Sequence, residues 1–327
     1  MKEYFDRKNG IFLKHKQYKQ TSDYKEKRKD RKFNKVENVD NNDYGIYADE
    51  DDEERVKEIW EKCIDYYEKR VVADVTDASF IEKNTQEQAS SQNWYYYRMK
   101  RLTASRFGDI CRALVDNSKI NIVKQLVYQQ EKKNVPKAIQ YGLDNESVAI
   151  DLYSQTENKK INKSGLRISS IYPFLGCSPD GLIFDSSSMD IDSVIEVKCP
   201  YAYQDFSLED IKQSKEFYMK YDQENETFSL KKTHQYYYQV QGILNILGLP
   251  YCEFVVYTPK NKLIVERIES NLAFWNSNML PKLKNFYFRF YLPELVLTRF
   301  EQGRNLFVFS EDFYQSTIIP YIEKIGQ

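Results

Sequence analysis

The residues best suited to chemistry in this chain are two carboxylates and a lysine, held in two short motifs. Asp180 lies in a Ser-Pro-Asp-Gly motif, and Glu196 and Lys198 lie in an Ile-Glu-Val-Lys motif after a spacer rich in Ser and Asp. Residues two apart on a strand point to the same face, so Glu196 and Lys198 are expected to project together while Val197 turns into the core. A strand hairpin would bring Asp180 to the same place.

Such a cluster has the parts that metal-assisted phosphodiester hydrolysis needs. The reaction requires a hard cation that neutralises developing charge and a water that attacks near neutral pH. Mg²⁺ takes oxygen ligands and is often held by only one or two carboxylates. Asp180 and Glu196 fit that demand, the Val197 carbonyl is available as a further ligand, and Lys198 can orient the water.

The alternative is an ordinary turn followed by a solvated strand face, because Pro-Asp-Gly is also a common turn sequence. The flanking residues argue against this interpretation. Residues 174–177, 182–184 and 194–195 are apolar, which places the charges within buried strands. A buried charge without a partner is costly unless it serves a metal.

Three further motifs accompany the hairpin along the chain. They are the segment Trp94–Gly108 with Arg98 and a Leu-Thr-Ala-Ser run, the segment Tyr141–Glu146, and the segment Tyr238–Gly242 with a Gln-x-Gln pattern. Together with Ser-Pro-Asp-Gly-Leu-Ile and Glu-Val-Lys-Cys-Pro, their order resembles the YqaJ-type viral recombinase family, the lambda-exonuclease-like branch of the PD-(D/E)xK nucleases. The resemblance extends over about residues 88–260, and four ordered motifs are far more specific than one.

The resemblance implies a role for each matching residue. Metal binding falls to four groups, the carboxylates of Asp180, Glu196 and Glu146 and the main-chain carbonyl of Val197. Lys198 becomes the catalytic lysine, and Gln239 supports that lysine and the water. Arg98 and Ser105 match positions that hold a terminal 5′-phosphate. The expected cofactor is Mg²⁺, with Mn²⁺ as the alternative.

Three of these residues also have simpler interpretations. Arg98 stands among other basic residues, so an exposed surface role is the alternative. Glu146 is alternatively a surface acid on a helix. Gln239 follows several tyrosines and is alternatively a polar group on the buried face of its helix.

The net charge of −1 is unusual for a DNA-binding protein, but the charges are distributed unevenly along the chain. Basic residues concentrate in 14–35 and acidic residues in 49–54. The basic stretch predicts disorder, and it is interpreted as a phosphate-binding arm, a nuclear import signal within 25–35, a partner of the acidic run or a solvated tail. Next to Arg98, the side chains expected to contact DNA phosphates without reading sequence are Lys100, Arg101 and Arg106.

The composition sets outer bounds. With 327 residues, 41% of them hydrophobic, the chain can bury a core. It has no run of about eighteen apolar residues and no signal-peptide core at its start, so we expect a soluble, intracellular protein of the nucleus or cytoplasm. Five scattered cysteines without a Cys-x-x-Cys pair suit a reducing compartment. Two histidines leave little for a histidine-based zinc site or a Ser-His-Asp triad.

Breaker residues and periodicity predict the elements that must position the site. Helices are expected over 53–72, 104–114, 119–130 with Ser118 as its cap, 136–152 and 234–247. Strands are expected over 165–169, 174–184, 193–199, 251–257 and 263–268, the first three forming a meander. A polar link over 82–92 and an irregular charged stretch around 222–226 separate these elements.

This order predicts a mixed α/β fold with a restriction-endonuclease-like, PD-(D/E)xK core, in which helices flank a central mixed sheet. An N-terminal charged segment and a helical C-terminal cover extend it. The predicted divisions are a disordered head (1–50), a helix and linker (51–87), the nuclease core (88–270) and a helical extension (271–327).

The resulting hypothesis is a Mg²⁺-dependent deoxyribonuclease that processes double-stranded DNA ends from 5′ to 3′ in recombination, repair or viral or mobile-element replication. The polarity follows from the resemblance alone. Its rivals are a structure-specific or site-specific endonuclease of the same fold and a DNA-binding or assembly protein without catalysis. The resemblance also implies a single-strand annealing protein as partner and a closed ring of identical subunits.

Overall fold

The computed structural model describes residues 3–6, 11–14, 53–128, 135–185 and 190–325. The chain divides into two compact units, Met1–Tyr44 and Gly45–Gln327. In the first unit, strands β1 (Glu3–Asp6) and β2 (Ile11–Lys14) pair antiparallel, within a head that the sequence predicted to be disordered. Residues 15–52, with most of the basic and acidic stretches, lie outside the described residues, so the interpretations of those stretches stay predictions.

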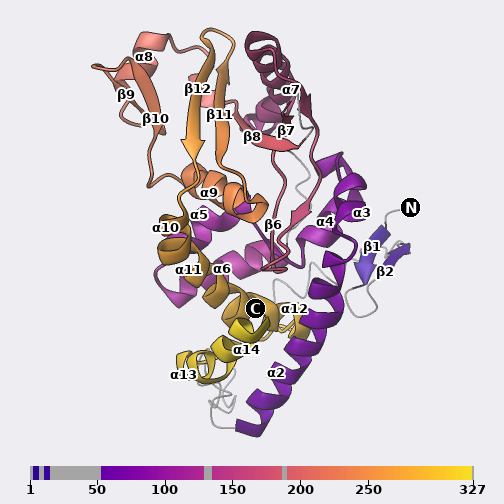
Figure 1. Ribbon diagram of the computed structural model, residues 1–327. Coiled ribbons are helices and arrows are strands. Elements are labelled where there is room, and N and C mark those ends of the chain that lie inside the picture. The colour runs from indigo at the N-terminus through magenta and orange to yellow at the C-terminus, as the bar shows by residue number, and fades with distance from the viewer. Residues whose placement is uncertain (1–2, 7–10, 15–52, 129–134, 186–189, 326–327) are drawn as a thin grey trace, which may run out of the picture. The chain divides into compact units, whose positions relative to one another are not determined.

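The second unit is built on a five-stranded mixed sheet with strand order β12-β11-β8-β7-β4 (Figure 1). Its strands are β4 (Ile161–Asn162), β7 (Gly181–Phe184), β8 (Ile191–Lys198), β11 (Tyr251–Thr258) and β12 (Lys262–Glu269). The central strand β8 pairs antiparallel with β7 and parallel with β11. The predicted mixed α/β fold with a central mixed sheet flanked by helices is confirmed.

One expected strand, residues 174–184, is two strands in two different sheets. β6 (Leu175–Cys177) lies in a small sheet between β3 (Leu102–Thr103) and β5 (Arg167–Ile168), whereas β7 begins only at Gly181. The break falls at Pro179, which has no N–H to donate to a strand ladder. The expected three-stranded meander is therefore wrong, because its two antiparallel pairs, β5–β6 and β7–β8, lie in different sheets.

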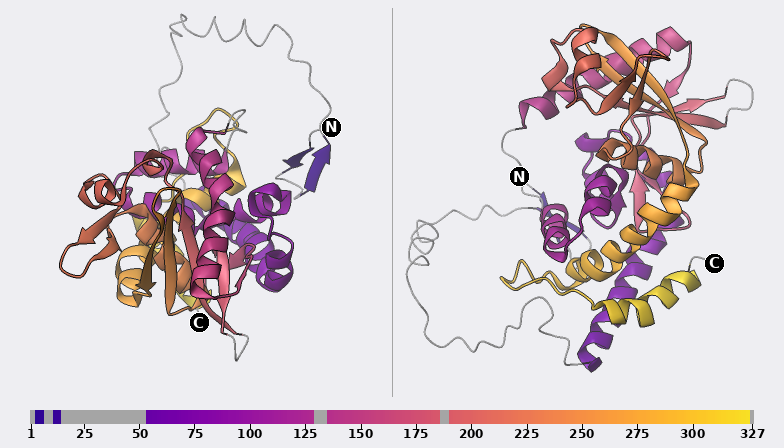
Figure 2. Two further views of the ribbon diagram at one scale, coloured as in Figure 1. Left: turned by 90° about the horizontal axis from the view of Figure 1, so that it is seen from above. Right: turned by 90° about the vertical axis from the view of Figure 1, so that its left-hand side faces the viewer.

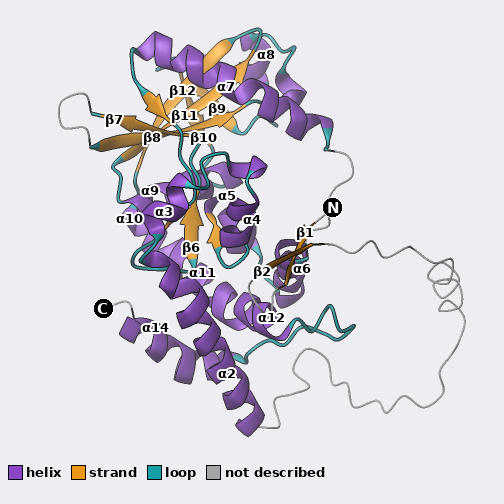
Figure 3. Cartoon of the chain, turned by 90° about the vertical axis from the view of Figure 1, so that its right-hand side faces the viewer, coloured by secondary structure: helices purple, strands orange, loops and turns teal. Residues whose placement is uncertain are grey.

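Helices cover both faces of the five-stranded sheet. The long helix α7 (Lys137–Glu157) packs against Ile195 and Val197 of β8, and Figure 3 shows it lying over the strands. Helix α9 (Gln235–Leu247) packs against β11 and contacts Glu196. Because successive strand residues point to opposite faces, Ile195 and Val197 face α7, whereas Val194 and Glu196 face α9.

Helix α5 (Ala104–Arg112) packs closely against α9. A Cβ added at Gly108 would come within 2.7 Å of the Cα of Gln235, so only glycine permits this approach of the two helices. The other short elements of this region are η3 (Ala73–Val75), α3 (Ala78–Lys83), η4 (Gln88–Ser90), α4 (Gln92–Arg98), α6 (Asp116–Val127), η5 (Tyr201–Tyr203), α8 (Leu208–Gln213), β9 (Met219–Asp222) and β10 (Thr227–Leu230).

Two local expectations differ from the structure. Helix α6 begins at Asp116, so Ser118 lies inside the helix and does not cap it. The stretch 222–226, expected to be irregular, is the turn of the β9–β10 hairpin. There the Asp222 carboxylate accepts hydrogen bonds from the amides of Glu224 and Asn225, the usual way in which Asp stabilises a turn.

The C-terminal part is helical, as predicted. It consists of α10 (Leu272–Phe274), η6 (Trp275–Met279), α11 (Leu280–Phe286), η7 (Tyr287–Tyr291), α12 (Leu292–Leu297), α13 (Glu311–Phe313), η8 (Tyr314–Ile318) and α14 (Ile319–Ile325). The N-terminal helix α2 (Glu53–Tyr67), continued by η2 (Glu68–Val72), packs against it, as Figure 2 shows in purple and yellow. Trp60 of α2 makes edge contacts with Phe288, Phe309 and Tyr321. No helix within the described ranges is both long and apolar enough to cross a bilayer.

Candidate active site

The β7–β8 hairpin and the loop before it bring Asp180, Glu196 and Lys198 together, as the sequence predicted. Glu196 lies in the middle of β8 and is only 1% exposed. Asp180 lies at the end of the loop that leads into β7, and its Oδ2 accepts a hydrogen bond of 2.6 Å from the amide of Val197. The loop is thereby tied to the strand that carries the other two side chains.

Glu196 is at the centre of the cluster. Its Oε1 accepts hydrogen bonds from the Lys198 ammonium and from the side-chain amide of Gln239 on α9. Its Oε2 is buried and has no hydrogen-bond partner. The Lys198 ammonium also lies 4.9 Å from the centre of the Tyr236 ring. One carboxylate oxygen is thus fixed by two donors while the other stays available to a ligand.

Burial and mutual repulsion raise the pKa values of the carboxyl groups in this cluster. Burial, together with the charge of Asp180, raises the pKa of Glu196 to about 8. The same two causes raise the pKa of Glu146, on α7, to about 7. Burial also raises the pKa of Asp180. Burial lowers the pKa of Lys198, but Glu196 and Asp180 outweigh that effect and hold its pKa above the usual value. Three carboxyl groups therefore share one ammonium, and an added cation would relieve their repulsion.

The donor set fits a hard divalent cation. In the described part of the chain, no three or more His, Cys, Asp and Glu side chains lie close enough together to hold a metal ion by themselves. A sparse site does not require such a group, because Mg²⁺ keeps several waters and takes substrate oxygens as ligands. The unpartnered Oε2 of Glu196 is the observation that favours a cation here, since a buried carboxylate oxygen without a donor is otherwise costly.

The predicted phosphate-binding residues lie on α4 and α5. Arg98 ends α4, and its guanidinium lies 3.8 Å from the centre of the Trp94 ring. Its Nη2 lies 3.5 Å from the hydroxyl oxygen of Ser105, which is exposed in the first turn of α5. Burial lowers the pKa of Arg98 to about 10, so the guanidinium is still charged at neutral pH. A cation and a helix N-terminus together suit an anion.

Two parallel strands bring the phosphate-binding residues to the carboxylates. β3 and β6 pair in parallel, with Leu102 opposite Leu175 and Thr103 opposite Gly176. Ser105 follows the carboxyl end of β3, and the Asp180 loop follows the carboxyl end of β6. The two segments therefore leave the small sheet at the same edge.

Comparison with known families supports the resemblance seen in the sequence. Residues 93–249 match the family model of the YqaJ-like viral recombinase domain. They make up a little under half of the chain and are called the YqaJ-like domain below after this match. The match contains the four motifs described above, whereas the predicted domain boundaries at 50, 87 and 270 stay predictions. A comparison with curated protein sequences gave no match.

Several solved structures similar to this chain are named as exonucleases. An alkaline exonuclease (LHK-Exo) from Laribacter hongkongensis is 21% identical, with 65% of this chain and 98% of that chain covered and a TM-score of 0.48. The shutoff and exonuclease protein of Kaposi's sarcoma-associated herpesvirus is 13% identical, with 69% and 79% covered and a TM-score of 0.45. A phage-related exonuclease from Haemophilus somnus 129PT is 15% identical, with 62% and 94% covered and a TM-score of 0.36.

Lys100 and Arg101 of the YqaJ-like domain are not placed to contact DNA. They are 5% and 2% exposed, and both pair with Asp74, at 2.6 Å and 2.8 Å. The Arg101 guanidinium also donates to the carbonyls of Val71, Tyr97 and Pro173. We therefore correct the sequence-based assignment, since both side chains hold the domain to the N-terminal helices.

Arg106 is different, because its side chain is about one third exposed and contacts Gln125 and Asp109 on the surface. Its predicted phosphate contact stays a prediction.

Sequence analysis missed two residues that touch the loop that carries Asp180. Trp94 donates from its indole N–H to the Ser178 hydroxyl at 3.0 Å, and Gln88 donates to the Pro179 carbonyl at 3.3 Å. Trp94 was within a recognised motif, and its spacing of four residues from Arg98 on a helix was the available signal. Gln88 lay in the segment taken for a polar link, and nothing local marks it.

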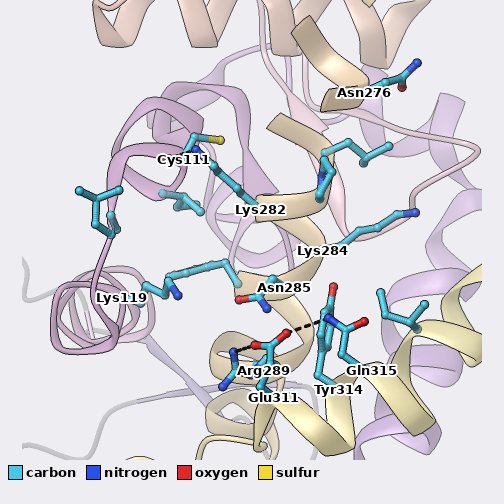
Figure 4. Close-up of a pocket in the computed structure, with 17 residues that line it drawn as sticks. Cys111, Lys119, Asn276, Lys282, Lys284, Asn285, Arg289, Glu311, Tyr314 and Gln315 are labelled. Atoms are coloured by element: carbon cyan, nitrogen blue, oxygen red, sulfur yellow. Dashed lines mark hydrogen bonds and ion pairs between the residues drawn. The ribbon is translucent and has the colours of Figure 1, made fainter. Parts of the chain in front are cut away.

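The cavity shown in Figure 4 does not belong to the YqaJ-like site. Its volume is about 630 Å³, and it lies mainly between α11 and the α13–η8 segment. None of the predicted site residues lines it. Two of its cations have carboxylate partners, because Arg289 pairs with Glu311 and Lys119 with Asp116, and Lys282 donates to the Cys111 carbonyl.

Removing Arg101 tests its new assignment. Arg101→Ala leaves buried carbonyls without donors and takes one of two cations from Asp74, so it should lower the free energy of unfolding by about 3–5 kcal/mol. Urea unfolding gives this value. Arg106→Ala is the matched control, because it should leave stability nearly unchanged and weaken DNA binding. A stable Arg101→Ala variant with weakened DNA binding would restore the original assignment.

Proposed function

We propose that this protein is a metal-dependent deoxyribonuclease that degrades double-stranded DNA from a 5′ end. The observation that carries the proposal is the buried Glu196, whose Oε1 is fixed by Lys198 and Gln239 and whose Oε2 is buried without a hydrogen-bond partner. The presence of a YqaJ-like domain supports it.

In this proposal the metal ligands are the carboxylates of Asp180, Glu196 and Glu146 and the carbonyl of Val197. Bound Mg²⁺, or Mn²⁺, would supply a Lewis acid for the phosphate and a more acidic water. Lys198 holds a positive charge beside Glu196 and can donate a hydrogen bond to the attacking water. Gln239 keeps the Glu196 carboxylate in one orientation, because it donates to Oε1 and leaves Oε2 without a donor.

Arg98 and Ser105 favour an exonuclease over an endonuclease. A guanidinium stacked on an aromatic ring is held in one plane and can make two parallel bonds to a phosphate. A terminal phosphate offers an extra negative charge that an internal diester lacks. A site of this kind next to the carboxylates would set the distance from the 5′ end to the bond that is cut.

The protein's assembly and partners belong to the same proposal. A ring of identical subunits and a single-strand annealing partner are expected from the family resemblance. Sedimentation with and without duplex DNA tests the ring directly.

Three DNA substrates separate the candidate functions. Purified protein and Mg²⁺ are incubated with blunt linear duplex carrying 5′-phosphates, the same duplex without them, and closed circular duplex. We expect the first to be degraded fastest and the circle to survive. Cleavage of the circle would identify an endonuclease, and no cleavage of any substrate would favour a binding protein.

The carboxylates give a first prediction of function. Asp180→Asn and Glu196→Gln should each lower cleavage by about a thousandfold, because each removes a negative ligand while keeping the side chain's shape. DNA binding should persist. The melting temperature of Asp180→Asn should not fall, since a buried charge is removed, whereas Glu196→Gln leaves the Lys198 ammonium without its ion-pair partner and should lower it. Nucleotide release and thermal unfolding measure both effects. Glu269→Gln, at an exposed position on β12, is the control, and full activity in either site variant would exclude the assignment.

Lys198 gives a second prediction, because it repels a bound cation but assists the water. Lys198→Ala should abolish turnover while Mg²⁺ affinity, measured by calorimetry, stays equal or rises slightly. Lys198→Arg should also fail, since a planar guanidinium does not replace a compact ammonium. Loss of metal binding in Lys198→Ala would show instead that Lys198 only organises the carboxylates.

Arg98 gives a third prediction, which concerns polarity. Arg98→Ala should cost about 2 kcal/mol, or about thirtyfold in initial rate, on phosphorylated ends and little on dephosphorylated ends. Comparing both proteins on both substrates cancels general effects of lost charge. Arg106→Ala should slow both substrates equally. An equal loss in Arg98→Ala would make Arg98 an ordinary backbone contact and would remove the argument for a 5′ start.

A further inference from the structure

Trp94 touches both halves of the candidate site. One face of its indole ring carries the Arg98 guanidinium at 3.8 Å, and its N–H donates to the Ser178 hydroxyl at 3.0 Å. Ser178 stands two residues before Asp180 in the loop between β6 and β7. Figures 1 and 3 show α4, which carries Trp94 and Arg98, beside β6. One rigid side chain thus joins the predicted phosphate ligand to the loop that carries a predicted metal ligand.

Gln88 holds the next residue of the same loop. Its side-chain amide donates to the carbonyl of Pro179 at 3.3 Å and to the carbonyl of Ser164 at 3.0 Å. Gln88 has a φ of 41°, a conformation that non-glycine residues seldom adopt, so the chain accepts local strain where this contact forms. The segment from Gln88 to Arg98 therefore binds two successive residues of the loop.

This segment is itself anchored to the body of the domain. Thr85 accepts a hydrogen bond of 2.7 Å from the amide of Leu166, and Glu82 accepts one of 3.1 Å from the amide of Gly165. A Cβ at Gly165 would overlap the carbonyl oxygen of Glu82, so the two segments are in direct contact. Because the residues just before Gln88 are fixed to the domain, the segment from Gln88 to Arg98 can set the position of the loop.

We propose that Trp94 is a positioning residue that fixes the Asp180 loop relative to Arg98, with Gln88 as a second support. The inference rests on the proposed nuclease function for its catalytic consequence, but not for its structural one. Without the indole N–H, the loop keeps its Val197 contact and loses a link to α4. Asp180 then samples more positions, which weakens metal binding and slows the reaction at saturating DNA. The Arg98 stack and the phosphate site are separate from this contact.

Two substitutions at Trp94 separate its two contacts. Trp94→Phe keeps an aromatic ring beneath Arg98 but has no N–H, whereas Trp94→Leu removes both contacts. Ser178→Ala removes the acceptor from the loop side and leaves α4 intact. Tyr95→Phe is the matched control, because Tyr95 is the neighbouring, exposed aromatic residue of α4. Thermal unfolding of each variant checks that the fold is kept.

Three measurements are made on the full-length protein. These are Mg²⁺ affinity by calorimetry, the rate constant at saturating phosphorylated duplex, and the preference of metal-free protein for phosphorylated over dephosphorylated duplex by fluorescence anisotropy. Trp94→Phe and Ser178→Ala should each lower Mg²⁺ affinity and the rate constant by about fivefold to tenfold. The double variant should show no further loss, because one hydrogen bond is removed in all three cases.

The preference for phosphorylated duplex should depend on an aromatic ring at position 94 and not on the indole N–H. Trp94→Phe should keep it, Trp94→Leu should lose most of it, and Tyr95→Phe should match the wild type in every measurement. The inference is overturned if Trp94→Phe and Ser178→Ala leave Mg²⁺ affinity unchanged, or if their effects add. A wild-type protein that cleaves nothing but shows the shared loss of Mg²⁺ affinity would end the proposed function and leave the positioning role standing.

Discussion

The structure depends on one constraint, the burial of the Glu196 carboxylate in the central strand of the main sheet. The side chain is buried, lies close to two other acids, and receives only one ammonium and one amide. Strand alternation turns its apolar neighbours toward α7 and leaves the charged face to α9. The sheet order, the close packing of α5 on α9 and the position of Gln239 all serve to surround this one group.

A second arrangement extends the site beyond the hairpin. Because β3 and β6 run in parallel, the N-terminus of α5 and the Asp180 loop leave the small sheet at one edge, although Ser105 and Asp180 are far apart in sequence. Helix α4 spans the gap through Trp94. The proposed phosphate site and the proposed metal site are thereby placed side by side, as the proposed substrate, with its terminal phosphate and scissile diester, would require.

The sequence could predict the elements that depend on residues near one another in the chain. The β7–β8 hairpin, α7 with Glu146 and α9 with Gln239 follow from period and turn residues, and the motifs placed them correctly. It could not predict that residues 174–184 would be shared between two sheets, because the apolar run continues past the break. It also could not separate Arg98 from Arg101. Both are arginines on one turn, and partners distant in sequence, Asp74 and the carbonyls of Val71 and Pro173, turn Arg101 inward.

The cost of the charged cluster is itself an argument about function. Replacing buried charges by apolar residues of similar volume is often neutral or stabilising, so packing alone gives a fold no reason to keep them. Lys198 and Gln239 donate only to Oε1 of Glu196. Oε2 has no donor, and the nearby acids Asp180 and Glu146 raise the pKa of Glu196. A protein that only bound DNA would not need the buried pair of Glu196 and Lys198. The place of Glu196 in the middle of the central strand supports the proposed metal site, in which the cluster would bind a hard cation next to a phosphate.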